Sequence, residues 1–216
     1  MPCPFCMIAG GTPPSSDPAI LRSQYGSAYP ILSTPIVIAF LDIAPLSRGH
    51  VLLCPRRHCA KSTEMTVAES AALGVWLPVL TRAVIKVVAP EGSLETASWN
   101  IIQANGNPFA PFISESLRSD NCTGAEAGQT VPHSHFHIIP RLGETRDSSD
   151  ISDAERKNIA LGEGPRERLA DGEGTELSKL IKVELEKEIK RLQDVDGAFK
   201  VEEELYVQTK ERGLKL

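Results

Sequence analysis

The sequence predicts an α+β fold: an antiparallel sheet of about five strands with helices on one face, followed by a C-terminal helical extension. Two kinds of segment support this. Short apolar runs bounded by Pro or Gly are typical of strands, whereas two longer segments repeat apolar residues at the spacing of a helix face. About five strands is a common sheet size. The hydrophobic content of 41% and the charged content of 24% are those of an ordinary globular chain.

Four segments have the composition of strands: residues 36–43 (IVIAFLDI), 50–54 (HVLLC), 99–104 (WNIIQA) and 130–139 (TVPHSHFHII). A short turn joins the first two, which predicts an antiparallel hairpin. On a strand, alternate side chains share one face. We therefore expect the imidazoles of His133, His135 and His137 to point the same way.

Two segments have the pattern of helices. Thr66 followed three residues later by Glu69 forms a capping box at the start of a helix over residues 66–88. Pro78 lies inside that helix and would strain or kink it. Residues 176–193 place apolar side chains on one side only, which predicts an amphipathic helix.

The composition divides the chain into two parts. Residues 1–146 form one predicted domain, interrupted at about 107–127 by a loop that is rich in Pro, Ser, Asn and Gly. Residues 147–216 are polar and charged, and they are expected to hold a flexible linker over 147–176 followed by the charged, amphipathic helical tail.

Charge and cysteine usage exclude several classes of protein. A net charge of −5 disfavours nonspecific nucleic-acid binding, and no apolar run is expected to approach the ~20 residues of a membrane helix. The first residues have no basic start and no long apolar core, unlike a secretory signal. Five cysteines without an export signal favour reduced thiols or metal ligands. We expect an intracellular protein, cytoplasmic and/or nuclear.

The chemistry of the chain centres on three alternating histidines, His133, His135 and His137. Three neighbouring imidazoles repel one another if they become charged, so a purely structural reason for them is hard to find. Two other interpretations remain: chance clustering on a solvent-facing strand, and a metal site made of the three histidines alone.

Residues 128–141 (GQTVPHSHFHIIPR) resemble the signature of the histidine-triad (HIT) family. Residues 39–43 (AFLDI) and 49–53 (GHVLL) resemble the paired strands of that family. Residues 100–106 (NIIQANG) resemble the strand before the triad. The resemblance spans roughly residues 3 to 141, and several motifs in the same order are more specific than the histidines alone.

The resemblance implies that residues 1–146 form a catalytic domain that hydrolyses a purine nucleotide. His135 would attack the α-phosphate and form a covalent nucleotidyl-histidine, which water then hydrolyses. His137 and His50 would hydrogen-bond the phosphate oxygens. The implied substrates are adenosine 5'-monophosphoramidates. The alternatives are a dinucleoside polyphosphate (Ap3A/Ap4A) hydrolase and, in another class, a nucleotide-binding regulator without essential turnover.

The resemblance also implies the residues that bind the nucleotide. Asp42 would accept hydrogen bonds from the two ribose hydroxyls, although an Asp at a strand end also suits a turn cap. The other candidates would line the base pocket, lie near the phosphate or assist the leaving group. They are Ile8, Phe40 and Ile43 for the base, Asn105 for the phosphate, and Gln129 and Thr130 for the leaving group. Core packing or an Asn-Gly turn could explain several of them instead.

Cys3 and Cys6 have the Cys-x-x-Cys spacing of a zinc ligand pair. The resemblance implies that His58 and His133 complete a closed Cys2His2 set, the arrangement of a structural Zn2+. The alternatives are a redox pair, two buried thiols and, at the level of function, a zinc-dependent scaffold. The family also forms homodimers, so a twofold-symmetric dimer is expected.

Overall fold

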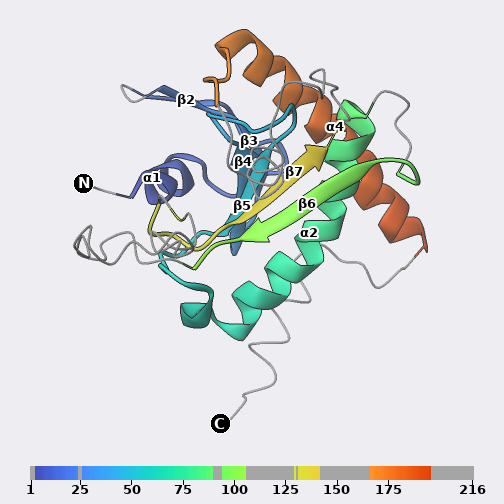
Figure 1. The fold of residues 1–216 in the computed structure, drawn as a ribbon. Coiled ribbons are helices and arrows are strands. Elements are labelled where there is room, and N and C mark those ends of the chain that lie inside the picture. The colour runs from blue at the N-terminus through green and yellow to red at the C-terminus, as the bar shows by residue number, and fades with distance from the viewer. Residues whose placement is uncertain are drawn as a thin grey trace, which may run out of the picture.

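The computed structural model describes residues 3–23, 26–89, 94–105, 129, 131–141 and 166–195. Its centre is a five-stranded antiparallel sheet in the order β3-β4-β5-β7-β6, and β1 and β2 form a separate two-stranded sheet (Figure 1). The predicted α+β class, the five-stranded sheet and the C-terminal helix are confirmed.

The strands are short and the two main helices are long. The strands are β1 (Leu21–Ser23), β2 (Gly26–Ala28), β3 (Pro30–Ser33), β4 (Val37–Leu41), β5 (Val51–Pro55), β6 (Ser98–Gln103) and β7 (Phe136–Arg141). The helices are α1 (Pro4–Gly11), α2 (Val67–Val88) and α4 (Asp171–Val195), with a 3-10 turn over Ser62–Glu64.

The β4–β5 hairpin is antiparallel, as predicted, and its strands are buried on both faces. Alternation along the strands separates two apolar clusters. Ala39 and its cross-strand partner Leu53 belong to the large core beneath α2 and α4. Phe40 and its partner Leu52 belong to a smaller cluster with α1 on the opposite face. The two long helices therefore share one face, while the short α1 covers part of the other.

Helix α2 begins with the predicted capping box. Thr66 Oγ1 accepts a hydrogen bond from the Glu69 N–H at 3.2 Å, and the Thr66 N–H donates to Glu69 Oε2 at 2.7 Å. The helix continues through Pro78. By length and composition α2 could cross a membrane, which corrects the expectation that no apolar run approaches that length. However, 56% of its apolar window is buried inside the protein, as in a core helix.

Helix α4 is part of the core. It begins at Asp171, so residues 171–175 are helical and not linker as predicted. Leu177, Ile181 and Leu185 are buried in the large core, and full burial of one such side chain is worth about 1.5–3 kcal/mol. A Cβ on Gly174 would lie 2.6 Å from the Tyr29 ring, so this glycine permits the close approach of α4 to β3.

A buried carboxylate also fastens α4 to α2. Glu188 accepts hydrogen bonds from Arg82 on α2 and from Arg191 on its own helix, and Lys86 lies within 3.4 Å. Arg191 first, and then Arg82, lower the pKa of Glu188 to about 2, although burial opposes this effect. The Glu188 carboxylate is therefore charged at neutral pH and forms ion pairs with arginines of both helices.

Three expectations differ from the structure or lie beyond it. The last strand begins at Phe136 and not at residue 130, and His133 lies in a bend before it. Strand β3 was not predicted. The inserted loop at 107–127 lies outside the described residues, and the proposed domain boundaries stay a prediction.

Candidate active site and metal centre

The segment that leads into β7 supplies residues to two clusters. His133 joins Cys3, Cys6 and His58, whereas His137, on β7, lies with His50 and Asp42. His135 lies between the two clusters, with its ring centroid 4.7 Å from that of His137. The predicted site residues are thus brought together, but the three imidazoles do not act as one set.

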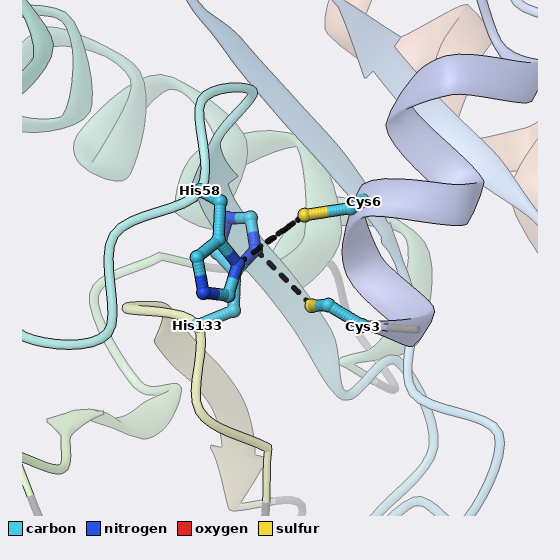
Figure 2. Close-up of side chains that lie close together, drawn as sticks. All are labelled: Cys3, Cys6, His58 and His133. Atoms are coloured by element: carbon cyan, nitrogen blue, oxygen red, sulfur yellow. Dashed lines mark hydrogen bonds between the residues drawn. The ribbon is translucent and has the colours of Figure 1, made fainter. Parts of the chain in front are cut away.

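The first cluster has the donors of a zinc site (Figure 2). Cys3 Sγ lies 3.4 Å from His133 Nδ1, and Cys6 Sγ lies 3.3 Å from His58 Nδ1. All four ligand atoms lie within 4.8 Å of one another. Tetrahedral zinc bound to sulfur and nitrogen requires S···N separations of about 3.5 Å. The donor set and its spacing therefore fit one zinc ion.

The local fold prepares this cluster for a cation. Cys3 caps α1 and Cys6 follows one turn later, so both thiols reach the same side of the helix. Burial, with the nearby Cys3 thiol, raises the pKa of Cys6 to about 11. The lone pair that a metal needs on His133 is fixed because its Nε2–H donates to the carbonyl oxygen of Pro55 at 2.8 Å, which leaves Nδ1 as an acceptor.

His135 has the opposite tautomer. Its Nδ1 lies 2.6 Å from the carbonyl oxygen of His133, so Nδ1–H donates and Nε2 keeps its lone pair. The ring is 3% exposed, and Phe5 packs edge-on against it with centroids 5.0 Å apart. Burial lowers the pKa of His135, although the hydrogen bond to His133 opposes this effect. His135 is therefore a neutral imidazole with an available nucleophilic nitrogen.

A chain of hydrogen bonds fixes the tautomers of the next two histidines. The Leu46 N–H donates to His50 Nδ1 at 3.2 Å, so the proton of the neutral His50 is on Nε2. That Nε2–H donates to His137 Nδ1 at 2.9 Å. The proton of His137 is consequently on Nε2, where it can serve as a donor to a phosphate oxygen.

Burial keeps both of these histidines uncharged. It is the largest cause that lowers the pKa of His50 well below its ordinary value. Burial and the neighbouring His135 lower the pKa of His137 to about 3. His50 and Asp42 therefore form no ion pair at neutral pH, although His50 Nδ1 lies 3.5 Å from Asp42 Oδ2.

Asp42 lies immediately after β4, with its side chain 10% exposed. Its Oδ1 accepts a hydrogen bond from the Ala44 N–H at 2.9 Å, which is the turn-capping contact anticipated as the alternative role. Burial raises the pKa of Asp42, while the Ala44 N–H and the Arg166 guanidinium oppose that shift. Its second oxygen lies 3.8 Å from Arg166 Nη1. The turn contact uses one oxygen of the carboxylate, and Oδ2 lies beside the two histidines.

The candidate base-pocket residues lie around α1. Phe40 is 3% exposed and packs against Phe5 with centroids 5.2 Å apart. Ile8 on α1 is partly buried against the same cluster. Ile43, by contrast, is 44% exposed. Phe40 and Ile8 thus have packing partners within the chain, whereas Ile43 offers apolar surface beside Asp42.

Asn105 and Gln129 both hydrogen-bond to the segment that follows β5. Asn105 Oδ1 accepts from the Ser62 N–H at 2.8 Å, and its amide exchanges hydrogen bonds with Gln103. Gln129 donates through Nε2 to the carbonyl oxygen of Ala60 at 2.8 Å. The buried Oε1 of Gln129 has no partner among the described residues, so it can accept from a ligand. Thr130 lies outside the described residues.

Two residues at this site were missed by the sequence interpretation. Phe5 was not chosen because an apolar residue between two cysteines has no distinguishing signal. Arg166 lies in a charged stretch, and no local pattern indicates that this stretch reaches Asp42. Only the folded chain brings these residues to the histidines.

The comparisons agree with this geometry. The HIT domain family matches residues 27–144. Over 169 residues the chain is 34% identical to the adenosine 5'-monophosphoramidase hnt1 of Schizosaccharomyces pombe, covering 76% of this chain and 95% of that protein. It is 31% identical to a bifunctional bis(5'-adenosyl)-triphosphatase/adenylylsulfatase FHIT of Arabidopsis thaliana, covering 55% and 52%.

A solved structure of a zinc-bound histidine triad family protein from Mycobacterium smegmatis has the same fold, with a TM-score of 0.51 and 23% identity. The structural alignment covers 91% of this chain and 99% of the chain of the Mycobacterium smegmatis protein. The chain therefore belongs to the HIT domain family, as its alternating histidines predicted, and its enzyme class is that of the HIT-type hydrolases.

Proposed function

We propose that the protein hydrolyses nucleotides at the α-phosphate through a covalent nucleotidyl-histidine on His135. One observation carries the proposal: the hydrogen bond of 2.6 Å from His135 Nδ1–H to the His133 carbonyl oxygen leaves Nε2 as a lone-pair nitrogen. A buried, neutral imidazole is a competent nucleophile, because no proton must first be removed from the attacking atom.

The reaction proceeds in two displacements. His135 Nε2 attacks the α-phosphorus, a new P–N bond forms, and the bond to the leaving group breaks with its electron pair going to that group. Water then attacks the same phosphorus, the P–N bond to His135 breaks with its electron pair returning to Nε2, and a nucleoside monophosphate leaves. The proton that the water loses balances the proton that the first leaving group takes up. Each displacement is easier than a single direct hydrolysis.

The neighbouring groups stabilise charge and hold the sugar. His137 Nε2–H donates to a phosphate oxygen, and His50 fixes that tautomer through its own hydrogen bond of 2.9 Å. Asp42 Oδ2 accepts from the ribose hydroxyls. Apolar side chains around α1, Phe40 and Ile8 among them, form the wall for the base, and Ile43 adds exposed apolar surface.

The proposed substrates are adenosine 5'-monophosphoramidates. The support is a relative of that name at 34% identity, which this chain matches over 95% of its length. The second candidate is a dinucleoside polyphosphate, because a relative named as a bis(5'-adenosyl)-triphosphatase is 31% identical over 119 residues. Both candidate substrates would be attacked by His135, and they differ in the leaving group.

Measuring kcat/KM for an adenosine phosphoramidate and for Ap3A and Ap4A on one preparation decides the substrate. We expect the phosphoramidate to be preferred, and the ratio compares the two transition states directly. A preference of about tenfold or more for either diadenosine compound, equal to about 1.4 kcal/mol, would overturn the substrate and leave the mechanism intact.

We also propose that Cys3, Cys6, His58 and His133 hold a structural zinc. Four protein donors fill a tetrahedral shell, which leaves no position for substrate. When bound, the ion would neutralise the thiols and tie α1 to the segment before β7. That tie would hold Phe5 against His135. None of the chemical steps above passes through the metal.

Two further properties belong to the proposal. A homodimer is supported by the edge strand β6, where Trp99 is 37% and Ile101 44% exposed. Light scattering on Trp99→Glu, which should be monomeric, tests it. An intracellular location, cytoplasmic and/or nuclear, is supported by four free cysteines among the described residues, which suit a reducing compartment.

A further inference from the structure

The chain that precedes α4 lies directly against the proposed nucleotide site. Residues 166–170 lie beyond the HIT match, which ends at residue 144. The Leu169 N–H donates to the carbonyl oxygen of Ile43 at 2.9 Å, next to Asp42. At the start of α4, Asp171 Oδ1 accepts from the Tyr29 hydroxyl at 2.6 Å. These two contacts fix the backbone of the segment beside the end of β4.

A cavity of about 190 Å³ lies at this junction. Its lining includes Asp42 and His50 together with Glu167, Arg168 and Leu169. The segment before α4 is therefore a wall of a space that opens onto two of the candidate site residues. No residue of this wall belongs to the part of the chain that matches the HIT family.

Arg166 comes immediately before these lining residues, and its side chain reaches Asp42. Its Nη1 lies 3.8 Å from Asp42 Oδ2, and its positive charge contributes to the lowered pKa of both His50 and His137. The side chain is 37% exposed, compared with 10% for Asp42, so it has room to change its rotamer. The guanidinium thus lies beside the carboxylate, and its charge acts on the two imidazoles.

A cation at this site would complement the charge of the substrate. His50 is buried and His137 partly buried, and both are neutral at pH 7, so neither they nor Asp42 offer a positive charge to the anionic phosphate of the substrate. A guanidinium presents paired N–H donors that match phosphate oxygens. Ribose hydroxyls that bind Asp42 would compete with Arg166 for the carboxylate, and the guanidinium would then turn one edge of its N–H fork to the phosphate.

We propose that Arg166, supplied from outside the HIT domain, binds the phosphate group of the nucleotide held at His50, His137 and Asp42. The inference rests on the proposed function, because it takes this cluster as the nucleotide site. Before binding, Arg166 rests against Asp42; in the complex it contacts phosphate oxygens. The C-terminal extension therefore completes the substrate site as well as the core.

Calorimetric binding of two probes to the full chain tests this assignment. AMP carries the phosphate and adenosine lacks it. In Arg166→Gln we expect AMP to bind about tenfold or more weakly, the loss of one charge-assisted hydrogen bond. Adenosine binding should be unchanged or stronger. Lys187→Gln, which removes one positive charge on α4 from an exposed side chain outside this cavity, should bind both probes within about twofold of wild type.

Each other outcome overturns the inference. Equal loss of AMP and adenosine affinity would mean that Arg166 only braces Asp42, and unchanged AMP affinity would mean that it does not touch the phosphate. If Arg166→Gln does not fold, Arg166→Lys keeps the charge without the fork and must show intermediate AMP affinity. Phosphoramidate hydrolysis by wild type, measured alongside, is a separate test: if it occurs while the Arg166 variants bind normally, only this inference fails.

Discussion

His133 and His135 are two residues apart, yet they belong to different kinds of site. The ring of His133 donates through Nε2 to the carbonyl of Pro55, so Nδ1 turns to the thiols. The ring of His135 donates through Nδ1 to the carbonyl of His133, so Nε2 is left for attack. The backbone carbonyl that each ring meets therefore sets which nitrogen keeps its lone pair, and these are the nitrogens that we propose as the zinc ligand of His133 and the nucleophile of His135.

The largest effect should come from removing the nucleophile. His135→Ala should lower kcat by about 10⁴-fold or more, because the variant lacks the nitrogen on which the proposed covalent intermediate forms. Steady-state kinetics on a phosphoramidate measures the loss. Zinc content and nucleotide affinity should remain close to wild type, because the ring supplies neither a metal donor nor a principal binding contact. Activity within a few-fold of wild type would rule out the mechanism.

Removing the thiols of Cys3 and Cys6 should have the reverse effect: loss of zinc and of stability, with activity largely retained. The Cys3→Ser, Cys6→Ser double variant should lose zinc and about 3 kcal/mol or more of unfolding free energy, since a structural ion contributes folding energy. Elemental analysis and thermal melting measure these effects, and kcat of the folded fraction should change only a few-fold. Cys59→Ser, a buried thiol outside the four-ligand set, is the control that should retain zinc. Unchanged melting in the double variant would contradict a structural metal.

A smaller effect is expected from acid, which should lower the free energy of unfolding because His137 is neutral in the folded protein. The folded pKa of His137 is about 3, below the ordinary 6.5, so the unfolded chain binds more protons between these values. Stability is therefore complete above about pH 6.5 and is lost as the pH falls toward 3. Between pH 7 and 4.5 we expect His137 to account for about 1–2 kcal/mol.

Urea unfolding of wild type and His137→Gln at both pH values isolates this contribution, because the two proteins share the same zinc ligands. The glutamine variant should lose less stability on acidification. An equal loss of unfolding free energy in both proteins would mean that the pKa of His137 is not lowered by folding.

Local signals predicted much of the fold. The capping box at Thr66 and Glu69 is a contact between residues three positions apart, so the sequence was sufficient to locate the start of α2. The β4–β5 hairpin followed from two apolar runs and one turn. Strand β3 was missed because its four residues are too few to show a period, and its pairing with β4 is set by tertiary packing.

The site was predictable only as far as its contacts are encoded in motifs. The triad and the Cys-x-x-Cys pair indicate the residues of the site, and the structure places His133 with the two cysteines and His137 with His50 and Asp42. The division of the histidines between two clusters depends on which carbonyl each ring meets, for which no sequence signal exists. Arg166 likewise reaches Asp42 only because α4 docks on the core.

Trapping the intermediate tests the central claim most directly. Wild-type protein mixed with an adenosine phosphoramidate, quenched in alkaline denaturant within the first turnover and mapped by mass spectrometry, should carry an adenylyl group on His135. The group should be absent from His135→Ala, which retains the other histidines and the zinc ligands. An adduct on His137, or rapid turnover by His135→Ala, would contradict the assignment of His135 as the nucleophile.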